Sequence, residues 1–257
     1  MNAQALRPAW LTARPIAHRG LHDHAAGRIE NSGSAARAAV EHGFAIECDV
    51  QLSADGEAMV FHDFRLDRLT GESGPVRARS AAVLSRIALA GSTDGIPTLP
   101  EFLDLIGGRV PLVVEIKSAF DGDFRLARRT AEIVAASNAP VAIKSFDPAV
   151  IAHLRENRAA LGVANTPLGI VAEADYSHGD WAALPKATQV DLANFLHYER
   201  SQPDFLSWRV RDLPHPTPYL CRTALGMPVM SWTVRTPEQR ALAALWADQM
   251  VFEGFVP

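Results

Sequence analysis

Several features that would place a protein in a specialised class are scarce in this sequence. It has 2 cysteines in 257 residues, too few for a disulfide framework, and a formal net charge of −4, without the basic surplus that nucleic-acid binding requires. No apolar run approaches the roughly 20 residues of a membrane span, and residues 1–15 contain none of signal-peptide length. We therefore expect a soluble cytoplasmic protein that has no membrane span and binds no nucleic acid.

What the sequence does contain is a regular alternation of strand and helix patterns. Runs typical of strands lie at 15–19, 45–50, 111–117, 141–145, 167–171, 204–210, 228–234 and 249–252. Helices are expected between them, including 99–106, 124–137 and about 191–200, and two more begin with a capping residue before proline, at Asp147-Pro148 and Thr236-Pro237. Eight strands that alternate with helices favour an α/β fold, a single (β/α)₈ TIM barrel over residues 1–257.

Charged residues interrupt two of these strands with a common spacing. Glu47 and Asp49 share one face of the second strand because successive side chains point to opposite faces, and Cys48 lies on the other. Glu115 and Lys117 share a face of the next barrel strand. A buried charge without a partner is costly, so these carboxylates require a cation. The all-oxygen set of Glu47, Asp49 and Glu115 suits Mg²⁺ or Ca²⁺ better than zinc.

The segment after the second strand departs from the regular alternation. A turn at Asp55-Gly56 predicts that residues 58–62 fold back beside the second strand and return His62 toward the carboxylates. Residues 64–96 follow, with several glycines and serines and a weak apolar pattern, and are too long for an ordinary loop. We interpret them as a small insertion into the barrel.

The order of the motifs resembles the glycerophosphodiester phosphodiesterase family. The shared motifs are His18-Arg19-Gly20, Glu30-Asn31, Glu47-x-Asp49, His62-Asp63, Ile96-Pro97-Thr98-Leu99, Glu115-x-Lys117, Ser145-Phe146 and Trp232-Thr233-Val234. They span nearly the whole chain in the family's order, which makes the resemblance far more specific than any one of them.

The resemblance implies a metal-dependent barrel enzyme that hydrolyses glycerophosphodiesters to an alcohol and glycerol phosphate. It assigns a divalent ion, Mg²⁺ or Ca²⁺, to Glu47, Asp49 and Glu115, acid–base catalysis to His18 and His62, and phosphate binding to Arg19 and Lys117. Glu30 is expected to line the site beside the second strand, and Trp232 to form a wall of the substrate pocket. The family places its insertion over the barrel mouth, so we expect residues 64–96 to take part in substrate choice.

The residues after the last strand differ from the family pattern, and seven histidines have no role in the assigned site. The family usually carries a threonine–aspartate pair after the last strand, whereas this chain has Val251-Phe252-Glu253-Gly254, so the role of Glu253 stays open. The other histidines follow no metal-ligand spacing and are expected at the surface or in helix caps: His22, His24, His42, His153, His178, His197 and His215.

Two alternative functions stay open beside hydrolysis of a small water-soluble phosphodiester. A lysophospholipase D-type enzyme acting on lysolipids or sphingolipids would add an apolar ramp for the acyl chain, but residues 64–96 contain few large apolar side chains. A non-catalytic barrel that binds a phosphodiester would be expected to lose a histidine or a ligand, and none is missing. The sequence therefore favours the water-soluble substrate.

Overall fold

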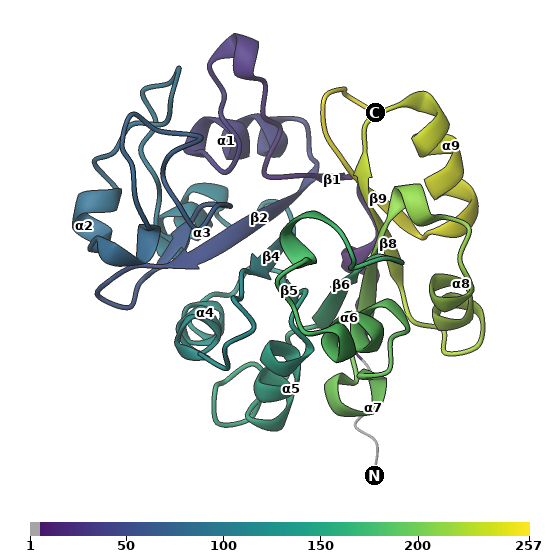
Figure 1. Cartoon of the computed structure of the whole chain (residues 1–257). Coiled ribbons are helices and arrows are strands. Elements are labelled where there is room, and N and C mark those ends of the chain that lie inside the picture. Colours follow the sequence, from purple (N-terminus) through teal and green to yellow (C-terminus); the bar gives the residue numbers. More distant parts are fainter. Residues whose placement is uncertain (1–5) are drawn as a thin grey trace.

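The computed structural model describes residues 6–257, in which eight parallel strands close into a barrel (Figure 1). The barrel strands are β1 (Ile16–Ala17), β2 (Ala45–Leu52), β4 (Leu112–Ile116), β5 (Val141–Ser145), β6 (Leu168–Ala172), β7 (Phe205–Arg209), β8 (Val229–Val234) and β9 (Gln249–Phe252). β1 closes the barrel because Ile16 pairs with Ala45 of β2 and with Val251 of β9. β3 (Ala58–Val60) lies antiparallel to β2, with Val60 opposite Val50. The predicted TIM barrel and its hairpin arm are confirmed.

Helices follow most strands and cover the outside of the barrel (Figure 1). They are α1 (Gly33–Glu41), α3 (Leu99–Ile106), α4 (Arg125–Ala135), α5 (Pro148–Glu156), α6 (Lys186–Ala193), α7 (Tyr198–Ser201), α8 (Pro216–Thr223) and α9 (Pro237–Trp246). The predicted caps Asp147 and Thr236 begin α5 and α9. The single helix predicted at about 191–200 is wrong, because Phe195 adopts a left-handed φ of 57° that separates α6 from α7. Within residues 6–257, no helix has the length and apolar character needed to cross a bilayer.

The first strand is shorter than predicted because the chain turns at its end. β1 ends at Ala17, and Arg19 and Gly20 have φ values of 56° and 80°. A Cβ atom at position 20 would lie 2.9 Å from the Cβ of Ala35, so this close approach to α1 requires glycine. The turn holds the side chains of His18 and Arg19 at the carboxyl end of β1.

Side chains inside the barrel form an apolar floor beneath a polar layer. The floor consists of Ile16, Ala45, Val113, Ala142, Phe205, Met230 and Val251. Phe205 fills the space beside Gly169, where a Cβ atom would lie 2.3 Å from its ring. On six of these strands, the residue two positions further along the chain points to the same face. These residues are polar or aromatic: His18, Glu47, Glu115, Lys144, Trp232 and Glu253. The polar layer thus lies at the carboxyl ends of the strands, where TIM barrels place their sites.

Residues 64–96 form a packed lobe beside β2 and β3, in the blue part of the chain (Figure 1). The lobe contains α2 (Ala81–Leu84) and shares a separate apolar cluster with neighbouring residues: Ile29, Met59, Phe61, Leu66, Leu69, Val76, Leu84, Ile87, Leu89 and Ile96. Most of its large apolar side chains therefore hold the lobe to the barrel, whereas Phe64 and Val83 are exposed.

Three of the minor histidines differ clearly in their surroundings. His215 accepts a hydrogen bond from the backbone N–H of Thr217 and caps α8, as expected. His197 has the N-cap position of α7, but its side chain does not cap the helix: it is buried, Nδ1 lies 3.0 Å from Ser201 Oγ, and burial lowers its pKa to about 4. His22 contacts the candidate active site described next.

Candidate active site

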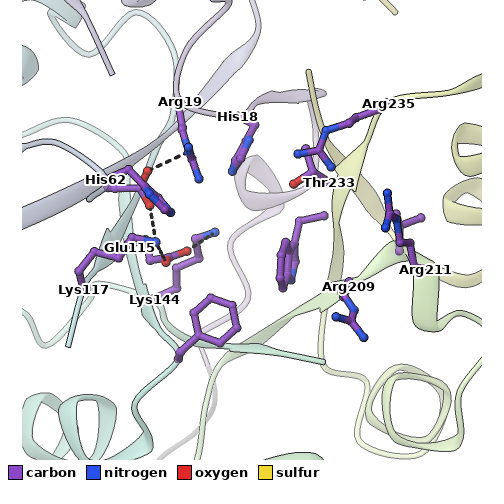
Figure 2. Close-up of a pocket in the computed structure, with 14 residues that line it drawn as sticks. His18, Arg19, His62, Glu115, Lys117, Lys144, Arg209, Arg211, Thr233 and Arg235 are labelled. Atoms are coloured by element: carbon purple, nitrogen blue, oxygen red, sulfur yellow. Dashed lines mark hydrogen bonds and ion pairs between the residues drawn. The ribbon is translucent and has the colours of Figure 1, made fainter. Parts of the chain in front are cut away.

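A cavity of about 280 Å³ opens at the carboxyl end of the barrel, and its lining residues are drawn in Figure 2. Seven of the residues predicted from the sequence line it: His18, Arg19, Asp49, His62, Glu115, Lys117 and Trp232. The other two, Glu30 and Glu47, lie directly behind this lining, since both contact Arg19. None of the lining residues, within the described part of the chain, comes from 64–96.

The three carboxylates predicted to bind a metal are buried together under the cavity. Glu47, Asp49 and Glu115 are 0%, 1% and 4% exposed, and one oxygen of each lies within 4.8 Å of the others. Lys117 Nζ lies 2.8 Å from Asp49 Oδ1 and also bonds Glu115. Lys144 Nζ lies 3.0 Å from Glu47 Oε1 and 3.1 Å from Glu115 Oε2. The donor set consists of buried carboxylate oxygens, which fits a hard divalent cation.

Neighbouring positive charges keep Asp49 and Glu115 ionised despite their burial. Burial raises the pKa of Asp49, but the charges of Lys117 and Arg19 outweigh it and hold the pKa well below its ordinary value. The pKa of Glu115 is lowered for the same reason, with Lys117 and Lys144 opposing burial. The pKa of Lys144 is raised in turn by Glu47 and Glu115. Asp49 and Glu115 are therefore anionic at neutral pH and available to a metal ion.

The role of Lys144 was missed in the sequence, although a signal was present. The predicted strand at 141–145 contains one charged residue in an otherwise uncharged run, which is the pattern that drew attention to Glu115. Lys144 is 2% exposed and lies between two carboxylates. It is therefore the counter-charge that the sequence argument required.

Replacing Lys144 with methionine is expected to destabilise the metal-free protein by about 3 kcal/mol, because it leaves buried Glu47 without its nearest cation and buried Glu115 with Lys117 alone. Urea denaturation in the presence of a chelator measures the change in the free energy of unfolding. Lys186→Met, at an exposed lysine of α6, is the matched control and should stay within about 0.5 kcal/mol of wild type. An unchanged denaturation midpoint for Lys144→Met would contradict the assigned role.

His18 is oriented by a carboxylate from the opposite end of the chain. Its Nδ1 hydrogen-bonds Glu253 Oε2, while its Nε2 lies 3.9 Å from Glu47 Oε2. Glu253 also accepts a hydrogen bond of 2.6 Å from Arg235 Nε and lies 3.5 Å from His22 Nε2. Burial raises the pKa of Glu253, but the hydrogen bond from His18 and the charge of Arg235 lower it well below its ordinary value.

His62 is oriented in a similar way by its neighbour in sequence. Its Nδ1 lies 2.7 Å from Asp63 Oδ1, and Asp63 in turn accepts hydrogen bonds from Arg68 of the insertion, at 2.7 Å from Nε and 2.9 Å from Nη2. Arg68 also binds Glu30. Each of the two predicted catalytic histidines therefore has Nδ1 against a carboxylate, which favours the tautomer whose Nε2 carries no proton.

Arg19 joins the carboxylate cluster to the loop that carries Glu30 and Asn31. Its Nη1 donates to Glu30 Oε1 at 2.6 Å, and its Nε lies 3.2 Å from Asp49 Oδ2. Asn31 donates to Asp49 Oδ2 at 2.9 Å and accepts from the backbone N–H of Asp49 at 3.2 Å. Asn31 therefore fixes the orientation of the Asp49 carboxylate, a role that the sequence pattern did not reveal.

The wall opposite these residues is aromatic and cationic. Trp232 donates from Nε1 to the backbone oxygen of Ser207 at 2.9 Å, and its ring stands perpendicular to that of Phe146 with the centroids 5.4 Å apart. Trp232 thus lines the cavity, and its role in substrate binding stays a prediction. Three arginines that sequence reasoning did not select, Arg209, Arg211 and Arg235, complete this side of the cavity (Figure 2).

Comparison with known proteins gives a consistent result. Residues 18–255 match the model of the glycerophosphoryl diester phosphodiesterase family. A glycerophosphodiester phosphodiesterase of Caldanaerobacter subterraneus subsp. tengcongensis is 39% identical over 112 residues, which covers 40% of this chain and 44% of that relative. The match thus spans less than half the length of this relative.

Solved structures share the fold over nearly the full length. A phosphodiesterase of Oleispira antarctica, in complex with the product sn-glycerol-3-phosphate, superposes with a TM-score of 0.74 at 20% identity and covers 95% of this chain and 94% of its own. A glycerophosphodiester phosphodiesterase of Thermotoga maritima gives 0.68 at 21% identity, with 92% of each chain covered. The family model, the barrel and the motif order lead to one conclusion: this chain belongs to the glycerophosphoryl diester phosphodiesterase family.

Proposed function

We propose that this protein is a metal-dependent phosphodiesterase that hydrolyses small glycerophosphodiesters to an alcohol and glycerol phosphate. One observation carries the proposal: two carboxylate-oriented histidines, His18 and His62, face the same cavity as a buried cluster of three carboxylates. A phosphate held above that cluster would have an imidazole available on either side of phosphorus. The product complex of the Oleispira antarctica relative supports glycerol phosphate as the product here.

Glu47, Asp49 and Glu115 would hold the divalent ion, Mg²⁺ or Ca²⁺. When bound, such an ion supplies positive charge to a phosphate oxygen and increases the acidity of a hydroxyl group. Arg19 and Lys117 line the cavity beside these carboxylates, and their charges stabilise the negative charge that develops on the phosphoryl oxygens.

The two histidines divide the proton transfers between them. One imidazole accepts the proton of the nucleophile at Nε2, and the other donates a proton to the oxygen of the departing alcohol. Glu253 and Asp63 hold the rings in place and stabilise the imidazolium form of each. The near symmetry of the two arrangements leaves both assignments of acid and base open.

The nucleophile is proposed to be the 2-hydroxyl group of the substrate's glycerol. This hydroxyl is already tethered close to phosphorus, and intramolecular attack can gain about 7–11 kcal/mol of barrier reduction in well-oriented systems. The alcohol then leaves first, and water opens the cyclic 1,2-phosphate that forms.

A substrate analogue that lacks only the 2-hydroxyl is therefore expected to react at least about 10²-fold more slowly than the parent, and ³¹P spectroscopy should detect the cyclic product during turnover. Equal rates for the two substrates, with no cyclic species, would instead indicate direct attack by water.

The preference for a water-soluble substrate is tested with glycerophosphoethanolamine and its acylated counterpart, lysophosphatidylethanolamine. The cavity lining has ten charged or titratable side chains among its 14 residues, and Phe146, Val210 and Trp232 are its only large apolar members in the described chain. We expect kcat/KM to be at least about tenfold higher for the unacylated substrate, because the cavity lining offers little apolar surface against which an acyl chain could be buried. Faster hydrolysis of the lysolipid would favour the phospholipase D alternative.

A further inference from the structure

The far side of the cavity carries a second group of positive charges, which we call the arginine wall (Arg209, Arg211 and Arg235). In Figure 2 these side chains lie across the cavity from His62, Glu115 and Lys117. Arg209 ends β7 and is the register partner of Trp232 on β8. The short η5 turn (Val210–Asp212) and the residue after β8 supply the other two.

The three arginines differ in how far protein carboxylates neutralise them. Arg209 is fully engaged, with Asp212 oxygens 2.9 Å from Nε and from Nη2, and Glu173 Oε2 2.6 Å from Nη1. Arg235 donates from its Nε to Glu253, and in the described part of the chain its two Nη atoms donate no hydrogen bond. Arg211 is exposed, and the described chain places neither a carboxylate nor a hydrogen-bond acceptor on its guanidinium.

These charges are not needed for the phosphodiester itself. The diester carries one negative charge, and Arg19 and Lys117 stand on the carboxylate side of the cavity where phosphate binding is proposed. A substrate bound there would extend its alcohol along Trp232 toward Arg211 and Arg235. The free guanidinium N–H groups on that wall form strong hydrogen bonds with carboxylate and phosphate oxygens.

We propose that the arginine wall selects glycerophosphodiesters whose alcohol carries a second anionic group, either a carboxylate or a phosphate. The inference rests on the proposed function and adds the substrate class. Phe146 and Trp232 could also attract a quaternary ammonium group through their ring faces. The charges of Arg211 and Arg235 in the same cavity lining oppose this, since repulsion between two cations has a longer range than attraction to a ring quadrupole.

Two matched pairs of substrates test the preference. Glycerophosphoserine and glycerophosphoethanolamine differ by one carboxylate, and glycerophosphoinositol phosphate and glycerophosphoinositol differ by one phosphate. We expect kcat/KM to favour the anionic member of at least one pair by about fivefold or more, which is the size of effect that an exposed ion pair gives. The difference should lie mainly in KM. The ratio of the two kcat/KM values should fall toward one as the salt concentration rises to about 1 M, where the Debye length is only roughly 3 Å.

Variants separate the arginine wall from a general effect of charge. Arg211→Glu reverses one charge on the wall and should bring the ratio of kcat/KM below one for the preferred pair. Arg240→Glu makes the same change at an exposed residue of α9 outside the cavity lining and should keep the wild-type ratio.

Equal hydrolysis of both members of both pairs by the wild type would overturn the inference while leaving the proposed function intact. A wild-type ratio that persists in Arg211→Glu, or that does not change with salt, would also overturn it. No hydrolysis of any of the four substrates would overturn both the inference and the proposed function.

Discussion

His18→Ala and His62→Ala are each expected to lower kcat by about 10²–10⁴-fold, the range typical of losing a general acid or base. Both imidazoles line the cavity and present Nε2 toward it, because Nδ1 is occupied by Glu253 or by Asp63. Alanine removes the proton acceptor or donor without adding bulk. The measurement is kcat on the best glycerophosphodiester, together with a circular dichroism spectrum that shows an intact fold.

Two further variants make the histidine experiment specific. His42→Ala removes an exposed histidine that follows α1 and should leave kcat within about twofold of wild type. Glu253→Gln keeps an oxygen next to His18 Nδ1 but removes the charge that stabilises the imidazolium, so we expect a smaller loss, about tenfold. Near wild-type turnover in His18→Ala or His62→Ala would remove that residue from the proposed chemistry.

The fold was predictable because it depends on patterns that repeat along the chain. Strand parity alone placed Glu47 and Asp49 on one face of their strand and Cys48 on the other, and the structure has the carboxylates inside the barrel and Cys48 in the apolar layer under the helices. The alternation of strands and helices then required those residues to share one end of the barrel. Errors occurred where a single residue in an unusual backbone conformation, such as Arg19 or Phe195, ended an element early.

The partners of the site residues were much harder to predict because they meet only after the barrel closes. Glu253 is 235 positions from His18 in the sequence and reaches it because β9 pairs with β1. Arg68 lies in a segment without regular strands, yet it connects Glu30 and Asp63. No local periodicity encodes such contacts. The role of Lys144 could have been predicted from the sequence, since its strand repeats the pattern that identified Glu115.

Removing divalent metal ions is expected to abolish hydrolysis, by about 10³-fold or more, without unfolding the protein. Each of the three buried carboxylates already has a basic side chain beside it, with Lys117 next to Asp49 and Glu115 and Lys144 next to Glu47. The fold therefore does not depend on the ion as a counter-charge. Chelation should abolish turnover while the circular dichroism spectrum stays unchanged, and added Mg²⁺ or Ca²⁺ should restore activity better than Zn²⁺.

Binding can be followed separately from activity through the thermal midpoint of unfolding. An ion that binds only the folded state raises the midpoint, and at 100 times its dissociation constant it adds about 2.7 kcal/mol. Mg²⁺ or Ca²⁺ should therefore raise the midpoint of the wild type but not of Asp49→Asn, whereas Glu199→Gln, at an exposed carboxylate of α7, should respond like the wild type. Full activity in metal-free buffer, with no midpoint shift, would assign Glu47, Asp49 and Glu115 to an ion-pair network alone.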